Sequence, residues 1–323
     1  MISIILPAYN AEKTIGEAIQ RIIDQTYKDW ELLIINDGSI DGTKTVIQSY
    51  HDPRIKYFEN EGNKKLIYTL NRGLELATGE YIARMDADDV ALPERLEKQV
   101  RFMDMHPDVV ASGCGMYEFI EARTIRTVPC EVNPKRIKVL LFNTSPIYHP
   151  TAIIRNSVVQ DNNIRYDSSA LHVEDYMLWY TLSKYGSLSN INENLLNYRL
   201  SETQVSNKYS KEQLNNKNVV RKLIIKDFLS SLQIHWNEDV SIINFIKVIE
   251  DKKGCLILDG VVKKQFEEVL FIFCMSTKKT FGALKCYFSL MIKGYRFSFK
   301  QQLIYLLTFF RLSKRWTSYS LNC

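Results

Sequence analysis

The sequence predicts an α/β protein with a doubly wound, mostly parallel sheet that becomes mixed, followed by a C-terminal α-helical subdomain. Strand and helix patterns alternate through residues 1–90 with short connections, which is the order of parallel α/β folds. Polar residues follow three of the predicted strands, and apolar residues have helical spacing after about residue 210. We therefore expect two domains, 1–210 and 211–323.

Four strands and three helices are predicted in the first 90 residues. Apolar runs predict strands at 2–6, 31–35, 54–58 and 81–85. Helical spacing predicts helices at 11–25, 42–50 and 65–77. Ligands of such sheets bind beyond the carboxyl ends of the strands. The polar segments 7–10, 36–38 and 86–88 are therefore expected to converge on one crevice.

Beyond residue 90 the pattern predicts a mixed sheet. A helix is expected at 93–105, two strands within 109–128, and another helix at 134–142. Two polar groups follow, at 149–151 and at 172–175, and the second opens a helix predicted over 176–185.

Composition indicates a soluble, intracellular protein. Of 323 residues, 46% are hydrophobic, which suits a globular core. The six cysteines stand singly, without a Cys-x-x-Cys pair, which argues against zinc and against a secreted disulfide framework. No signal-peptide pattern opens the chain, and no apolar run reaches the roughly 18 to 20 residues that span a bilayer. We expect a cytoplasmic location.

The net charge of +5 conceals a basic C-terminal region. No acidic residue follows Glu268, whereas lysines and arginines recur between aromatic clusters up to Arg315. Such amphipathic helices would bind an anionic membrane surface, which would place the protein peripherally on the inner face of the cell membrane. An ordinary helical subdomain with a solvated basic face is the alternative. Nucleic acid ranks lower, because no recognition motif is present.

The acidic segment Asp86-Ala87-Asp88-Asp89 follows the predicted strand 81–85. Carboxylates two residues apart on an extended segment point to one side, so Asp86 and Asp88 can share a divalent cation while Asp89 faces elsewhere. This arrangement suits a nucleotide-diphosphate substrate. A solvated acidic turn is the more frequent meaning of an isolated Asp-x-Asp.

Four motifs in order resemble family 2 glycosyltransferases, which are inverting enzymes of the GT-A fold that use nucleotide-diphospho-sugars. They are Pro7-Ala8-Tyr9-Asn10, Asn36-Asp37-Gly38-Ser39-x-Asp41-Gly42-Thr43, Gly79-Glu80-Tyr81, and Arg84-Met85-Asp86-Ala87-Asp88-Asp89 with Pro93-x-Arg95-Leu96. The resemblance covers about the first 210 residues. It implies a role in bacterial cell-surface glycan or polysaccharide synthesis.

The resemblance also implies roles on the donor side. Asp37 would accept a hydrogen bond from the nucleotide base, and Tyr9 lies in the loop that packs on that base. Asp88 would bind Mg²⁺ or Mn²⁺ directly, and Asp86 would support the ribose or a metal-bound water. The full implied nucleotide-sugar set is Pro7, Ala8, Tyr9, Asp37, Arg84, Asp86 and Ala87.

On the acceptor side, Glu174-Asp175 resembles the family's Glu-Asp pair, whose Asp takes the proton from the attacking hydroxyl. Asp175 is thus the expected catalytic base, with Glu174 beside it; a carboxylate that merely complements a helix dipole is the alternative. His149 and Arg199 are expected near the acceptor, although a structural histidine at a strand end explains His149 equally well.

Two departures from the family pattern are informative. Ser201 stands where many members have a histidine, and Arg315-Trp316 lacks the glutamine that processive synthases place before it, since Leu312 occupies that position. We therefore expect addition of a single sugar.

The predicted function is an inverting, metal-dependent glycosyltransferase that moves one sugar from a nucleotide-diphospho-sugar to a hydroxyl of a glycan or lipid-linked acceptor. UDP is the default nucleotide, although guanine and thymine offer comparable hydrogen-bond donors to Asp37. Two alternatives are weaker. A catalytically silent glycan- or lipid-binding module would lack a base or a metal carboxylate, and a sugar nucleotidyltransferase would need a glycine-rich loop that residues 7–12 do not provide.

Overall fold

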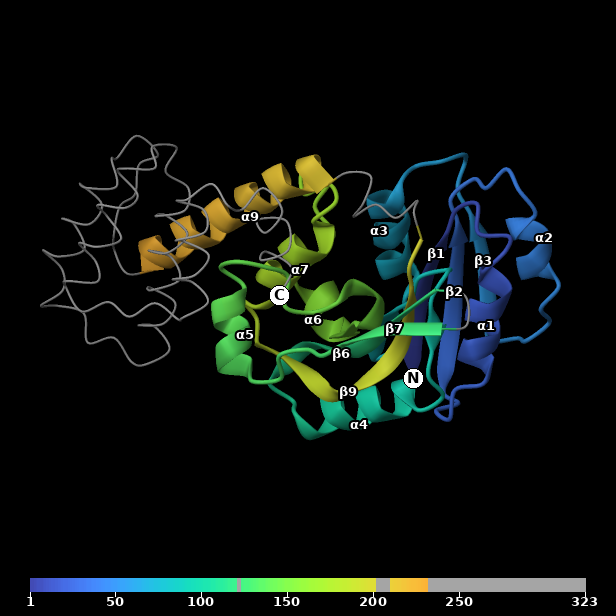
Figure 1. The fold of residues 1–323 in the computed structure, drawn as a ribbon, viewed down its shortest axis with the longest axis horizontal. Helices are drawn as coiled ribbons and strands as arrows, with labels where there is room; N and C mark the ends of the chain where they lie inside the picture. The colour runs from blue at the N-terminus through green and yellow to red at the C-terminus, as the bar shows by residue number, and fades with distance from the viewer. Residues whose placement is uncertain (121–122, 202–209, 232–323) are drawn as a thin grey trace, which may run out of the picture. The chain divides into compact units, whose positions relative to one another are not determined.

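The computed structural model describes residues 1–120, 123–201 and 210–231 (Figure 1). Its strands are β1 (Ile2–Ala8), β2 (Trp30–Asn36), β3 (Ile55–Glu59), β4 (Tyr81–Arg84), β5 (Val90–Ala91), β6 (Val109–Ile120), β7 (Arg123–Val128), β8 (Ile153–Arg155) and β9 (Ser187–Arg199). Its helices are α1 (Ile15–Ile23), α2 (Thr43–Gln48), α3 (Leu66–Leu76), α4 (Arg95–Met105), α5 (Pro134–Leu140), the 3₁₀ helix η1 (His149–Thr151), α6 (Asn156–Asp161), α7 (Glu174–Leu182) and α9 (Ser210–Ser231).

The strands form one mixed sheet in the order β3-β2-β1-β4-β8-β6-β9-β5, with β7 paired to β6. The first four are parallel. β8 runs antiparallel to both β4 and β6, while β9 runs parallel to β6. The predicted doubly wound sheet that becomes mixed is therefore confirmed. The direction changes beside β4, the strand that ends at the acidic segment.

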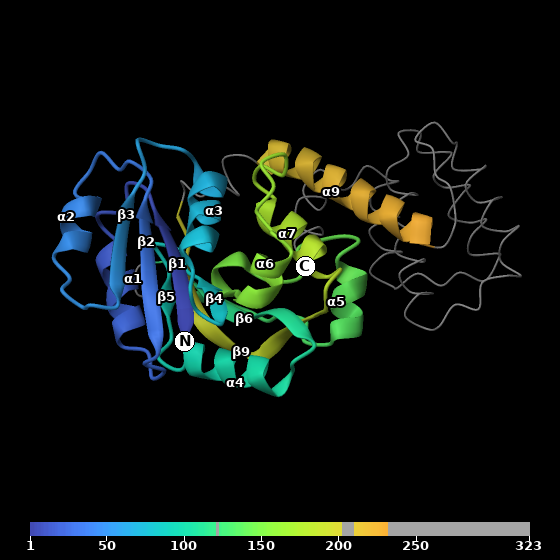
Figure 2. The ribbon, with the colours of Figure 1, turned by 180° about the vertical axis from the view of Figure 1, so that it is seen from behind.

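Helices cover both faces of the parallel part of the sheet. α1 and α2 lie on one face and α3 on the other, as two opposite views show (Figures 1 and 2). The alternation of β1 explains this arrangement, because successive side chains point to opposite faces. Ile2, Ile4 and Leu6 join the core that contains α1. Ile5 points to the other face, where it lies against Gly73 of α3.

β8, α6 and β9 were not predicted from the sequence. β8 has only three residues, which is too short for a periodic pattern. β9 has thirteen, but serine, asparagine and glutamate recur along it, so no apolar run marks it. It is a strand because β6 pairs with most of its length and β5 with its end. Tertiary pairing, rather than local propensity, makes these residues extended.

The chain divides into two compact units. The first contains Met1–Ile137 and Ser145–Lys217, and the second contains Lys138–Thr144 and the chain from Asn218 onward. The boundary predicted near residue 210 stays a prediction, because most of the C-terminal region lies outside the described residues. The same holds for the basic residues after Glu268, for the Arg315-Trp316 comparison and for four of the six cysteines.

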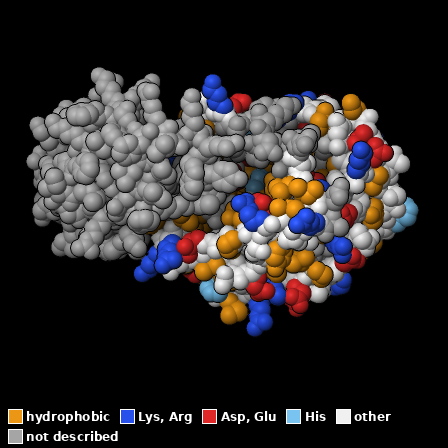
Figure 3. All heavy atoms as spheres, viewed as in Figure 1, with side chains coloured by type: hydrophobic (Ala, Val, Ile, Leu, Met, Phe, Trp, Pro, Cys, Tyr) orange, Lys and Arg blue, Asp and Glu red, His pale blue; other side chains and the backbone are white. Residues whose placement is uncertain are grey.

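No helix among the described residues has the length and apolarity needed to cross a bilayer. On the face shown in Figure 3, lysines and arginines of the described part are interspersed with aspartates and glutamates. The predicted membrane surface, the basic region after Glu268, lies outside the described residues.

Two glycines within helices provide a test of the packing. A Cβ added to Gly73 would lie 2.5 Å from Cγ2 of the buried Ile5, whereas a Cβ added to Gly16 of α1 would lie 3.4 Å from Val46, an ordinary contact. We expect Gly73→Ala to lower the free energy of unfolding by about 1–3 kcal/mol. Gly16→Ala should leave it unchanged or raise it by up to about 1 kcal/mol. Equal effects in urea denaturation would contradict this packing.

Candidate functional site

Asp37 lies at the carboxyl end of β2, where it ties down the loop after β3. Asn60 Nδ2 and the Lys64 N–H donate to Asp37 Oδ1 at 2.7 and 2.8 Å, and the Lys65 N–H donates to Oδ2 at 2.9 Å. The loop needs this support, because Lys65 has a φ of 75°, which is unfavourable for a residue with a side chain. The carboxylate keeps acceptor capacity mainly on Oδ2.

The β1 loop meets the same end of the sheet. The Asp37 N–H donates to the Ala8 carbonyl at 2.8 Å, and the Asn10 N–H donates to Ser39 Oγ at 3.0 Å. Tyr9, the side chain expected to pack on a base, is 47% exposed. Pro7 and Ala8 complete β1. The predicted donor-side residues of β1 and β2 are thus brought together.

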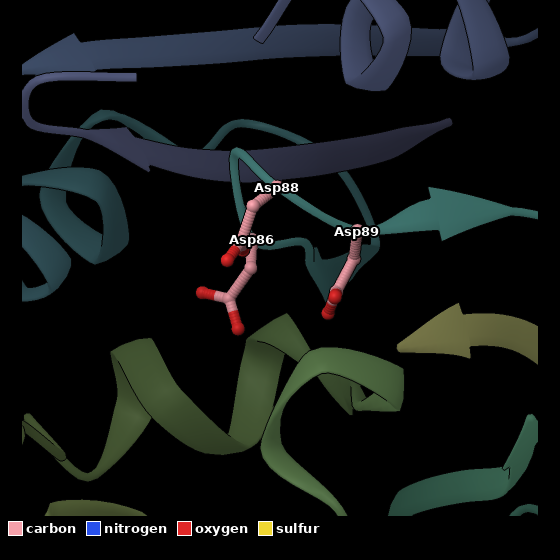
Figure 4. Close-up of side chains that lie close together, drawn as sticks. All are labelled: Asp86, Asp88 and Asp89. Atoms are coloured by element: carbon pink, nitrogen blue, oxygen red, sulfur yellow. The ribbon is translucent and has the colours of Figure 1, made fainter. Parts of the chain in front are cut away.

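The acidic segment is a turn, and it gathers three carboxylates. The Asp89 N–H is 3.4 Å from the Asp86 carbonyl, and oxygens of Asp86, Asp88 and Asp89 all lie within 4.8 Å of one another. Figure 4 shows the three side chains on one side of this turn. The expectation that Asp89 faces elsewhere is therefore wrong. It assumed an extended segment, whereas the chain reverses after Met85 to enter β5.

Arg84 neutralises part of this negative charge. Its guanidinium forms a two-point ion pair with Asp86, in which Nη1 donates to Oδ2 at 2.6 Å and Nη2 pairs with Oδ1. Burial alone would lower the pKa of Arg84, but the charges of Asp86 and Asp89 raise it overall. Its Nε is buried without a hydrogen-bond partner among the described residues.

The negative charges of Asp88 and Asp89 are less neutralised than that of Asp86, which pairs with Arg84. Burial and the neighbouring charge of Asp86 raise the pKa of Asp88 to about 6. Burial, with the charges of Asp86 and Asp88, raises the pKa of Asp89 well above its ordinary value. Oδ2 of Asp89 is buried and finds no hydrogen-bond partner in the described part of the chain. This turn carries excess negative charge that a bound cation would relieve.

Arg199, at the end of β9, holds this turn in place. Its backbone N–H donates to Asp89 Oδ1 at 3.0 Å, and its side-chain Nε donates to the Asp88 carbonyl at 2.8 Å. The same guanidinium pairs with Glu17 of α1 at 2.6 Å and lies 4.5 Å above the Phe119 ring. The structure thus places Arg199 beside the acidic turn. Sequence reasoning expected it near the acceptor.

Arg95 supports the turn from the core. It is buried, with Nη2 donating to the Arg84 carbonyl at 2.6 Å and Nε donating to Gln99 at 3.1 Å. Gln99 then donates to the carbonyl of Thr151 in η1 at 2.6 Å. This buried chain of hydrogen bonds connects the end of β4 to the segment that carries His149.

His149 pairs with Tyr166. Its Nε2 lies 2.9 Å from the Tyr166 hydroxyl, and its ring packs on Trp179 with centroids 6.1 Å apart. Burial and the positive charge of Arg84 lower the pKa of His149 well below its usual value, so the ring is neutral at pH 7. Tyr166 is fixed by its backbone too, since its N–H and carbonyl both bond the Asn71 side chain at 2.7 and 2.9 Å.

Glu174 and Asp175 occupy the first turn of α7. Ser145 Oγ donates to Asp175 Oδ2 at 2.9 Å. Burial raises the pKa of Asp175, while the Ser145 hydroxyl and the Tyr176 N–H act against that shift by favouring the carboxylate. Burial and the charge of Asp175 raise the pKa of Glu174 to about 7. At pH 7 Glu174 therefore holds a proton for about half of the time.

Arg84 connects the two halves of the site. Its charge acts on Asp86 and Asp89 on one side and on His149, Glu174 and Asp175 on the other. Sequence reasoning missed Tyr166, Ser145 and Asn60, which hold the predicted residues in place. Tyr166 stands ahead of the acidic pair in a mostly polar segment, where no pattern marks it. Nothing in the sequence around Ser145 or Asn60 pointed to them.

The chain has clear relatives. Residues 3–162 match the family described as Glycosyl transferase family 2. An uncharacterized glycosyltransferase of Haemophilus influenzae is 34% identical over 262 residues, which are 77% of this chain and 80% of the relative. The Escherichia coli UDP-Glc:alpha-D-GlcNAc-diphosphoundecaprenol beta-1,3-glucosyltransferase WfgD is 33% identical over 215 residues, 66% of this chain and 82% of the relative.

Solved structures share the fold. Residues 1–349 of S. aureus TarS, in complex with UDP, superpose with a TM-score of 0.57 at 19% identity, covering 86% of this chain and 81% of that TarS fragment. The mannosyltransferase PcManGT of Pyrobaculum calidifontis, in complex with GDP-Man and Mn²⁺, gives 0.52 at 13% identity and covers 98% of this chain and 87% of PcManGT. These likenesses establish a GT-A-like fold, and the relatives establish the family. The chain belongs to glycosyl transferase family 2 and is a glycosyltransferase.

Proposed function

We propose that this glycosyltransferase moves one sugar, with inversion, from a nucleotide-diphospho-sugar to a hydroxyl of a glycan or lipid-linked acceptor in cell-surface polysaccharide synthesis. The observation that carries the proposal is the position of Arg84. This buried cation stands between a cluster of three carboxylates suited to a metal diphosphate and a carboxylate pair suited to deprotonating a hydroxyl. The name of WfgD, which gives a UDP-glucose donor and a diphosphoundecaprenol-linked acceptor, supports the same substrate classes.

The acidic turn fits a divalent cation. Carboxylate oxygens are the ligands that Mg²⁺ and Mn²⁺ prefer, and the buried Asp89 Oδ2 lacks a hydrogen-bond partner among the described residues. Asp88 would bind the ion directly, while Asp86, already paired with Arg84, would support the ribose or a metal-bound water. When bound, the ion would neutralise charge on the leaving diphosphate as a Lewis acid.

Asp37 favours a nucleotide whose base presents a single hydrogen-bond donor. A carboxylate has about four acceptor positions, and three hydrogen bonds already occupy Asp37, two on Oδ1 and one on Oδ2. Guanine would present two neighbouring donors, N1–H and N2–H, to the two oxygens at once. Uracil presents the single donor N3–H, which the remaining position on Oδ2 can accept. This count supports UDP over GDP as the nucleotide of the donor.

Asp175 would act as the catalytic base. The Ser145 hydroxyl fixes one of its oxygens at 2.9 Å, which orients the carboxylate toward an acceptor hydroxyl. Glu174, whose pKa is about 7, would be protonated for about half of the time at neutral pH. Tyr166 and the neutral His149 form a hydrogen-bonded pair next to Arg84. An uncharged sugar acceptor would approach the base along this uncharged surface.

The basic C-terminal region 211–323 and its attachment to the inner face of the membrane remain part of this proposal. A lipid-linked acceptor would sit at that surface, and anionic lipid attracts lysine and arginine. The cytoplasmic location belongs to the same proposal.

We expect Asp88→Asn to weaken Mn²⁺ binding by at least about 10-fold, because it removes a charged ligand. In the wild type, Mn²⁺ affinity should also fall as the pH drops through about 6, where the Asp88 carboxylate takes up a proton. Calorimetric titration with MnCl₂ at pH 5.5 and 7.5 measures both effects. Unchanged affinity in the variant would remove Asp88 from the metal site.

The same substitution should stabilise the metal-free protein. The pKa of Asp88 is about 6 in the folded chain and 3.8 without the fold, so ionising Asp88 costs stability as the pH rises between these values. Asp88→Asn removes that penalty and should raise the free energy of unfolding at pH 7.5 in EDTA by about 1–2 kcal/mol, less than the full shift because the group is partly exposed. A less stable variant would show that Asp88 is a structural carboxylate.

Asp175→Asn should abolish transfer and keep donor binding. Loss of a general base costs roughly 10²- to 10⁴-fold in rate, whereas the asparagine oxygen can still accept from Ser145. The assay follows UDP release and product from UDP-glucose and a GlcNAc-diphosphoryl lipid, with the exposed Asp161→Asn as control. Near-normal turnover in the Asp175 variant would move the base elsewhere, with Glu174 the next candidate.

A further inference from the structure

The first two turns of α9 bind the loop that leads into α7. Gln213 Nε2 donates to the His172 carbonyl at 3.0 Å, and Asn216 Nδ2 donates to the Leu171 carbonyl at 2.8 Å. The Glu212 carboxylate lies 3.8 Å from Nε2 of the His172 ring. All these residues belong to the first compact unit. Part of the region predicted as the C-terminal subdomain thus contacts the segment that carries Glu174 and Asp175.

This loop has a conformation that needs external support. His172 has a φ of 65°, in the left-handed region that residues with a side chain seldom adopt. Val173, the residue before α7, provides no side-chain cap for the helix. Backbone conformations of this kind persist where the surroundings hold them. Here the two carbonyl bonds from α9 supply such contacts at consecutive peptide groups.

The support reaches the carboxylate pair through one residue. The N–H of His172 hydrogen-bonds the Glu174 carboxylate and acts to lower its pKa, although burial dominates. The carbonyl of the same residue accepts from Gln213. His172 is therefore bound on one side to α9 and on the other to Glu174. A shift of this loop would move the first turn of α7, which carries Asp175, the proposed catalytic base.

We propose that Gln213 and Asn216 are positioning residues for the base. They fix the 171–173 loop so that Asp175 meets the acceptor hydroxyl at hydrogen-bond distance. The inference rests on the proposed role of Asp175. A displacement of about 1 Å at a reacting group can cost roughly 10²-fold in rate, while a single hydrogen bond near the protein surface contributes little to the stability of the fold. Their loss should therefore affect turnover more than folding.

The first test measures the loop and needs no substrate. Gln213→Glu and Asn216→Asp keep the side-chain shape but replace the amide donor with a carboxylate that cannot donate to a carbonyl. Asn215→Asp, on the exposed neighbouring position of α9, adds the same charge and serves as the matched control. In hydrogen–deuterium exchange of the full chain, peptides covering 170–177 should exchange at least about 10-fold faster in Gln213→Glu and Asn216→Asp. Exchange equal to that of Asn215→Asp would overturn the proposal.

The second test measures catalysis with UDP-glucose and the GlcNAc-diphosphoryl lipid. Both variants should lose at least about 10-fold in kcat, with the Kd for UDP and Mn²⁺ within twofold of that of Asn215→Asp. Gln213→Asn, which restores a shorter amide donor, should recover part of kcat. An unchanged kcat in both variants would overturn the positioning role. If wild type transfers nothing to this lipid, the proposed acceptor fails, whereas the exchange result still decides whether α9 holds the loop.

Discussion

The ion pair between Arg84 and Asp86 is the interaction on which the site depends. A guanidinium this deeply buried needs a partner that replaces the water it has lost, and Asp86 supplies two acceptor oxygens. The pair fixes the start of the acidic turn and places one positive charge among five carboxylates and a histidine. Burial and that charge together lower the pKa of His149, and the charge opposes the raised pKa of Glu174 and Asp175. Without it, burial and mutual repulsion would drive several of these carboxylates toward their protonated forms.

Sheet topology explains why these groups meet. β4 is the last strand of the parallel series, and its other neighbour, β8, runs antiparallel to it. The loops that end β1 and β2 therefore lie on one side of the β4 terminus. η1, which immediately precedes β8, lies on the other side and carries His149. The buried bonds from Arg95 through Gln99 to Thr151 hold this junction together. The residues proposed for the donor side and those proposed for the acceptor side are thus neighbours although they are far apart in the sequence.

The parts of this structure that follow from local pattern were predictable. Apolar runs predicted the parallel strands, and the position of Asp37 and Asp86 after such runs placed both at one edge of the sheet. Asp89 was misjudged, because the pattern does not show that the chain turns after Met85. β9 was missed because its polar residues are extended only through pairing with β6. The contact of Gln213 with the His172 carbonyl joins segments 41 residues apart, and no local signal in either segment marks it.

Calorimetric titration of the purified protein with UDP, GDP and dTDP, with and without Mn²⁺, tests the central claim most directly. The account predicts that UDP binds, that Mn²⁺ strengthens this binding, and that GDP binds at least about 10-fold more weakly because Asp37 has one free acceptor position for the two donors of guanine. GDP binding as tight as UDP binding would contradict the hydrogen-bond count at Asp37. Binding of UDP that ignores Mn²⁺ would contradict the assignment of the acidic turn to a metal diphosphate.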